Sequence, residues 1–247
     1  MNLGQIRAQV RKRLGDGNAA FWTDAELNGY INDGLRDISF RTKSIRANDY
    51  ISAVSCASNT VGSGSNEYAL ASNFTDIYSV LEVYFMESGT EWIRLDSRLR
   101  DDLDEEFDGW RGNVGFTYTD TGSGVTTYNK NANPGTPDRY YWSREEDIIG
   151  LDPPPDDTQA GSDRIRVYYA KKHTDLGTDT ESPTIPEPLH LGAIFYAVAV
   201  GFEDRGWGDR ANDNWSKYWG RMKDYKMERN REREDDEIQS INYKSRG

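Results

Sequence analysis

An acidic run near the middle of the chain, DDLDEEFDGW at positions 101–110, offers side chains that could bind a divalent cation. Carboxylate oxygens are good Ca²⁺ ligands, and Asp104, Glu106 and Asp108 match the first, third and fifth positions of an EF-hand loop. The twelfth position, which needs a bidentate Glu, is Gly115. We therefore predict no metal site and interpret the run as an acidic surface. Its candidate residues are Asp101, Asp102, Asp104, Glu105, Glu106 and Asp108.

Other catalytic chemistry has few candidate side chains, because the chain holds two histidines and one cysteine. Neither His173 nor His190 lies in a motif with a nucleophile, and no G-x-S-x-G sequence supports a serine hydrolase. We predict structural roles for both histidines and a core position for Cys56. The sequence thus indicates a protein that is not an enzyme and needs no cofactor. Paired carboxylates beside abundant Trp and Tyr leave a carbohydrate-active enzyme or carbohydrate-binding module as an alternative.

The C-terminal stretch has the composition of a partner-binding arm. An apolar stripe with helical spacing runs from Trp215 to Tyr225 and stops before Glu228, after which ten residues are almost entirely charged. A charged segment without an apolar face is either disordered or ordered on a partner, so we predict a C-terminal arm over residues 228–247. The candidate partner-binding residues are Arg229, Arg231, Arg233, Ile238, Ile241 and Tyr243.

Helices are expected at both ends of the chain. Apolar residues at helical spacing predict a first helix over residues 3–14, and Thr23 with Glu26 forms a capping box that starts a second helix. Residues 181–227 then predict two further helices, the first of them apolar nearly all the way round. We expect these helices to form one bundle.

The middle of the chain changes to β character. Alternating apolar residues divided by Gly, Ser and Asn clusters predict strands over residues 49–180, with a charged helix at 97–107, a hairpin near 139–151 and a strand at 163–170. The predicted fold is α+β, a bundle of N- and C-terminal helices (1–48 and 181–227) with an inserted antiparallel β domain and an extended C-terminal arm.

Composition excludes several classes of protein. The single cysteine argues against a disulfide scaffold, and the longest apolar run, residues 191–202, is too short to span a membrane; we also expect no signal peptide.

Charge is unevenly distributed along the chain. Residues 1–48 contain eight Lys and Arg against five Asp and Glu, residues 49–202 contain 11 against 26, and residues 203–247 contain 11 against 11. The net charges of the three segments are therefore +3, −15 and 0. An acidic middle repels phosphate, which argues against tight nucleic-acid binding by this segment.

The order of several motifs resembles that of the head-to-tail adaptor proteins of tailed bacteriophages. The resemblance covers most of the chain, but the Gly-rich segment 109–135 departs from it. Its motifs are WTDAELNGYINDGL (Trp22 to Leu35), GTPDRYYW (Gly135 to Trp142), PPPD (Pro153 to Asp156), IRVYY (Ile165 to Tyr169) and IPEPLH (Ile185 to His190).

The resemblance implies a structural protein of the virion neck, made in the host cytoplasm, that forms a homo-oligomeric ring, commonly a dodecamer. It implies binding to the portal protein through the C-terminal segment, binding to a tail protein of the nozzle or tail tube, and a role in DNA ejection. The acidic middle would suit a conduit through which double-stranded DNA passes without specific binding. We expect no membrane partner. Besides the carbohydrate-active protein, the alternative is another neck or tail component that does not contact the portal.

Overall fold

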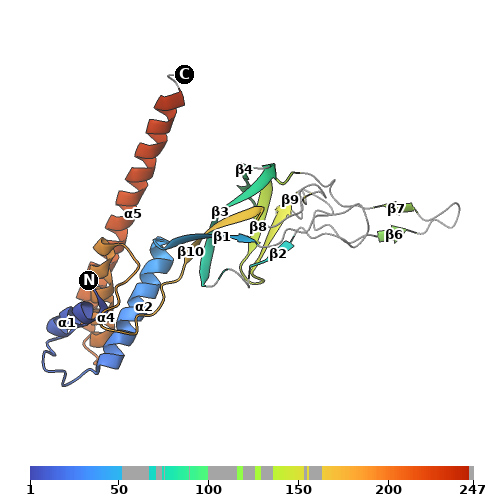
Figure 1. The fold of residues 1–247 in the computed structure, drawn as a ribbon. Helices are drawn as coiled ribbons and strands as arrows, with labels where there is room; N and C mark the ends of the chain where they lie inside the picture. The colour runs from blue at the N-terminus through green and yellow to red at the C-terminus, as the bar shows by residue number, and fades with distance from the viewer. Residues whose placement is uncertain are drawn as a thin grey trace. The chain divides into compact units, whose positions relative to one another are not determined.

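The chain folds into two compact units that are described separately here (Figure 1). One, the helical unit, comprises residues 1–45 and 171–247, and the other, the β unit, comprises residues 46–170. The structure is a computed structural model that describes residues 1–51, 67–70, 74, 76–88, 90–99, 116–118, 126–128, 136–152, 155 and 163–244. Helices and strands therefore separate into different units, which confirms the predicted α+β class.

The helical unit is built from helices of both chain ends. Local signals define where the first two begin: Asn2 with Gln5, and Thr23 with Glu26, each form a capping box. The Thr23 hydroxyl accepts the Glu26 backbone N–H at 3.2 Å, and the Glu26 carboxylate accepts the Thr23 N–H at 2.7 Å, as predicted. The elements are α1 (Leu3–Leu14), α2 (Asp24–Thr42), the 3-10 helix η2 (Glu187–Leu189), α4 (His190–Asp204) and α5 (Gly208–Lys244).

Helix α4 lies at the centre of the helical unit. Most of its residues are buried, because α1, α2 and α5 all pack against it. Gly34 of α2 permits a close helix crossing, since a Cβ at this position would lie 3.0 Å from the Tyr196 ring of α4. The same core includes the apolar stripe of α1, which is almost fully buried: Leu3, Ile6, Val10 and Leu14.

The β unit contains two four-stranded sheets that share one core. In the first, the order is β1 (Arg46–Ile51), β10 (Ile165–Lys171), β3 (Ile77–Ser88) and β4 (Glu91–Arg94). In the second, it is β2 (Glu67–Ala69), β9 (Ile148–Asp152), β8 (Arg139–Ser143) and β5 (Asp96–Ser97). A separate hairpin joins β6 (Phe116–Tyr118) and β7 (Thr126–Tyr128). Side chains from both four-stranded sheets meet in the shared core.

The β8–β9 hairpin confirms the hairpin predicted near residues 139–151 and depends on one glycine. Tyr141 lies opposite Gly150 in the register, and its ring occupies the space above that glycine. A Cβ on Gly150 would lie 1.6 Å from Tyr141 Cε1, which is far inside any van der Waals contact. Only a residue without a side chain fits this position.

Two sequence expectations differ from the structure. A helix was expected from Ser97, but Asp96–Ser97 form β5 and pair in parallel with β8, because the backbone N–H groups of Asp96 and Arg98 find acceptors beside that strand. Residues 171–180, assigned to the β-rich segment, belong to the helical unit, where Leu176 N–H donates to Asn32 of α2 at 3.0 Å. The acidic run 101–108 and Cys56 lie outside the described residues.

Candidate partner-binding surfaces

Helix α5 carries the predicted arm, and its first half is anchored in the bundle. Ala211, Tyr218 and Met222 are buried against the helical core, and Trp215 and Tyr225 pack at its edge. At an α-helical rise of about 1.5 Å per residue, the 37 residues of α5 span roughly 55 Å. Its C-terminal half extends past the other helices of the unit (Figure 1). Residues 228–244, which were expected to be either disordered or ordered on a partner, thus continue the same helix.

Tyr218 connects α5 to α2 through a partly buried polar contact. Its hydroxyl donates to the Asp37 carboxylate, which also accepts from Arg41 Nε at 2.7 Å. Burial, followed by the contact with this carboxylate, raises the pKa of Tyr218 far above its ordinary value. The phenol therefore stays protonated and keeps donating. The network holds the register of α5 on α2.

Arg229 makes a second connection between α5 and α2, eleven residues after Tyr218. Its guanidinium donates to the carbonyl oxygens of Thr42 at 2.6 Å and Lys43 at 3.4 Å. Helix α2 ends at Thr42, and Lys43 has a left-handed backbone with φ of 48°. Because the last carbonyls of a helix lack intrahelical donors and carry partial negative charge, a cation is favourable there. Arg229 thus caps α2 while it belongs to α5.

The remaining candidate arm residues lie beyond this capping contact. Arg231 is exposed. Arg233, Ile238, Ile241 and Tyr243 lie on the helical backbone of α5, and their side chains are outside the described residues. The sequence analysis grouped Arg229 with them, whereas the structure joins Arg229 to the bundle. The contact of Arg229 with α2 could not be predicted from the sequence, because its acceptor, the Thr42 carbonyl, lies 187 residues earlier in the chain.

Two large apolar side chains on α5 are exposed before the arm begins. Trp219 is 46% exposed and Met227 is 49% exposed. The Arg41 guanidinium lies 4.6 Å from the Trp219 ring centroid, so a cation–π contact covers part of this ring. Tryptophan, methionine and arginine are enriched in protein interfaces. These side chains add an apolar surface to the helix that carries the arm.

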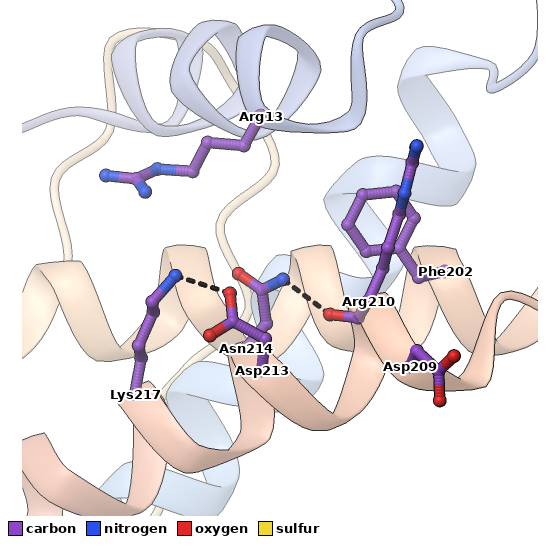
Figure 2. A pocket seen from close by; sticks show the side chains of 7 residues that line it. All are labelled: Arg13, Phe202, Asp209, Arg210, Asp213, Asn214 and Lys217. Atoms are coloured by element: carbon purple, nitrogen blue, oxygen red, sulfur yellow. Dashed lines mark hydrogen bonds and ion pairs between the residues drawn. The ribbon is translucent and has the colours of Figure 1, made fainter.

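A groove of about 460 Å³ lies between the C-terminal end of α1 and the start of α5 (Figure 2). Lys217 Nζ contacts the Asp213 carboxylate at 2.5 Å, and Asn214 donates to the Arg210 carbonyl at 2.8 Å. Its lining is Arg13, Phe202, Asp209, Arg210, Asp213, Asn214 and Lys217. This lining includes no Ser, Cys or His that could act as a nucleophile or base with those carboxylates. The groove is a mixed-charge surface.

Both histidines are internal hydrogen-bond partners of the helical unit. His173 Nε2 accepts the Thr184 N–H at 3.2 Å, while His190 Nε2 donates to the Ile185 carbonyl at 3.1 Å and its Nδ1 lies 3.2 Å from the Met1 amine. Burial lowers the pKa of each imidazole. They are therefore neutral at physiological pH.

The described residues also hold no cluster typical of a metal centre. Within that part of the chain, no group of three or more His, Cys, Asp or Glu is placed to hold a metal ion. A search of the same residues finds no helix with the length and apolar character needed to cross a membrane. The acidic candidates Asp101 to Asp108 lie outside the described ranges.

Comparison with known proteins identifies the family. A family model described as SU10 adaptor protein matches residues 1–240, which is nearly the whole chain. The chain therefore belongs to the SU10 adaptor protein family and is a bacteriophage adaptor, a structural protein, which confirms the resemblance seen in the sequence. No curated protein matches the chain significantly.

Proposed function

We propose that this SU10-family adaptor forms a ring in the virion neck, between the portal and the tail, and that the distal part of α5 docks on the portal. The observation that carries the proposal is the continuity of α5, which remains helical through Lys244 after its capping contact at Arg229. A helix that continues beyond its own bundle exposes backbone and side chains that a partner can bury. Exposed Trp219 and Met227 support a partner-binding role for the same helix.

The charge distribution supports a role as a DNA conduit. Residues 46–170, the β unit, contain 10 Lys and Arg against 22 Asp and Glu, which is a net charge of −12. The helical unit contains 20 of each and is neutral. A negatively charged wall repels the DNA phosphates, so a duplex would pass it without adhering. We propose that the acidic unit, including Asp101 to Asp108, contributes to the lumen or to the ring surface.

Portal binding by α5 can be tested with three proteins: the full chain, a chain that ends at residue 231, and full-length Gly220→Ala as a control on the same helix. Gly220 is open to solvent, because a Cβ there meets no atom within 4 Å. Each protein is mixed with purified portal rings, and complexes are counted by electron microscopy. We expect the full chain and Gly220→Ala to add a ring, and the shortened chain to fail while its bundle unfolds at the same temperature.

Two outcomes would contradict the proposal. If the shortened chain adds to portal rings as well as the full chain does, the distal part of α5 is not the portal contact. If the full chain forms no complex with portal rings but joins a purified tail protein, the chain is another neck or tail component.

A further inference from the structure

The outer face of the sheet β1-β10-β3-β4 carries an aromatic and cationic cluster that the core does not use. Along β10, Ile165, Val167 and Tyr169 are buried against the second sheet, so the alternate residues Arg166 and Tyr168 lie on the opposite face. The same alternation applies to the neighbouring strands. The outer-face residues on the neighbouring strands are Arg46, Asn48 and Tyr50 on β1, Glu82 and Tyr84 on β3, and Trp92 and Arg94 on β4.

The rings of this face contact one another across the strands. Tyr84 and Tyr168 have centroids 5.5 Å apart with an interplanar angle of 67°, and Tyr50 and Trp92 have centroids 6.0 Å apart at 47°. The Arg166 guanidinium lies over the rings of Tyr50 and Tyr168, 5.5 Å from the first centroid and 4.9 Å from the second. Because neighbouring rings are tilted against each other, they do not form the flat platform on which sugar rings or bases stack.

This composition is typical of a protein interface. Tyr, Trp and Arg are the residue types most enriched among side chains that dominate binding energy, and rigid rings lose little entropy when they are covered. The four aromatic side chains are half-buried, so part of each ring remains open to a partner. Arg94, whose side chain is 64% exposed, pairs with Glu82 at 3.3 Å at the edge of the cluster.

The face is positively charged within an acidic unit. Arg46, Arg94 and Arg166 outnumber Glu82, while the unit as a whole has 12 more acidic than basic residues. An exposed turn of the same unit has the opposite charge: residues 144–147, which join β8 to β9, are Arg-Glu-Glu-Asp and are all exposed. The turn belongs to the second sheet. One copy therefore presents a cationic aromatic face and, on its other sheet, an acidic turn.

We infer that the outer face of the β1-β10-β3-β4 sheet binds the β8–β9 turn of a second copy of this chain. A contact between two different patches of the same protein is head-to-tail, and a head-to-tail contact closes into a ring when its rotation allows. Opposite charges on the two patches would set the register and steer the encounter. The inference deepens the ring proposed above and rests on it, because it names the surface through which neighbouring copies meet.

Charge reversal on each patch tests the inference. The face variant is Arg94→Glu with Arg166→Glu, and the turn variant is Glu145→Lys with Glu146→Lys; Arg98→Glu, an exposed residue just after β5, is the control. Ring formation, alone and on portal rings, is followed by mass photometry over a range of protein concentrations. We expect each variant to assemble at least roughly tenfold more weakly than the native chain and the control, because like charges then meet across the contact.

A mixture of the two variants separates an interface from a folding defect. In an equimolar mixture the reversed face meets the reversed turn, and the native face of one variant meets the native turn of the other, so we expect alternating rings to form again. Arg94→Glu alone is the second face variant, because Arg166 packs between two tyrosine rings and its replacement could disturb the sheet. Assembly should also weaken as salt concentration rises.

The outcomes distinguish the inference from the proposed function. Rings that form equally well from the native chain and from both variants would overturn this interface and leave the adaptor ring intact. Failure of the equimolar mixture to assemble, with both variants folded, would also overturn it. If the native chain forms no ring either alone or on portal rings, both the ring and the interface are wrong.

Discussion

The two units of the chain differ in charge and in histidine content. The helical unit balances 20 basic against 20 acidic residues and contains both histidines, whereas the β unit contains neither histidine and carries the whole net charge of −12. Helix starts in the first unit are set by residues three positions apart, while strands β1 and β10 pair although more than a hundred residues separate them. The chain thus combines a neutral helical unit, whose first two helices begin at local capping boxes, with an acidic β unit.

This difference suits an adaptor protein. A bundle with well-defined helix starts and a central buried helix is rigid and provides the anchor for α5. An inserted sheet unit can carry surface charge and exposed turns without disturbing that anchor, because each unit has its own hydrophobic core. Each unit should therefore respond separately to substitution and to pH.

Gly150→Ala should have the largest effect and should damage only the β unit. The new Cβ would lie 1.6 Å from Tyr141 Cε1, so the β8–β9 pair must separate or the ring must leave its position. Overpacking of this severity costs about 3 kcal/mol or more. Chemical unfolding monitored by near-ultraviolet circular dichroism, with limited proteolysis to assign the cut sites, measures the loss. Cleavage within the helical unit at the same denaturant concentration would show that the units are not independent.

Gly34→Ala should destabilise the helical unit by about 1–3 kcal/mol, because its Cβ would lie 3.0 Å from three atoms of Tyr196 at the α2–α4 crossing. The matched control is Gly29→Ala on the same helix, where no atom lies within 4 Å of the added Cβ. There, better helix propensity should stabilise the unit by about 0.5–1 kcal/mol. Opposite shifts of the melting temperature confirm the close crossing, and equal shifts contradict it.

Mild acid should weaken the helical unit selectively. Burial lowers the pKa of His173 and His190 below the unfolded value of about 6.5, so the unfolded state binds more protons and stability falls as pH decreases below about 6.5. The slope is at most about 1.4 kcal/mol per pH unit for each histidine. Protonation of His173 Nε2 would also remove its hydrogen bond from Thr184.

The β unit should respond in the opposite direction as pH falls through the raised pKa of Asp152. Burial raises the pKa of Asp152, although the Arg139 guanidinium 3.2 Å away opposes the shift. A carboxyl that binds its proton more readily when folded favours the folded state as pH falls through its raised pKa. Melting curves of the full chain from pH 7.5 down to pH 4, resolved for each unit by proteolysis, check the contrast. An equal response of the two units would remove this difference between them.

Local patterns predicted much of the helical unit. The first helix was predicted with its observed bounds, and the Thr23 capping box forms the hydrogen bonds expected from its sequence. The β8–β9 hairpin and the strand β10 were also found, within two residues at each end. These features depend on neighbours in sequence, because caps, helical faces and short hairpins are formed by residues a few positions apart.

The misses involve interactions between distant residues. Ser97 was assigned to a helix, yet it lies in the edge strand β5. This strand pairs in parallel with β8, where Ser97 lies opposite Tyr140. Arg229 was grouped with the partner-binding arm, and its hydrogen bond to the last carbonyl of α2 could not be predicted from the sequence. The aromatic face of the first sheet could not be recognised either, since the register of four strands brings its members together.

The sequence by itself determined the α+β class, the starts of the first two helices, the acidic character of the middle segment and the family, because composition, capping and motif order are properties of the linear chain. Only the tertiary structure decided that Arg229 caps α2, that Gly150 must lack a side chain and that Arg166 lies between two tyrosines. The contacts of Arg229 with Thr42 and of Arg166 with Tyr50 join residues far apart in sequence, and side-chain placement such as that of Tyr141 over Gly150 is set only in the packed fold.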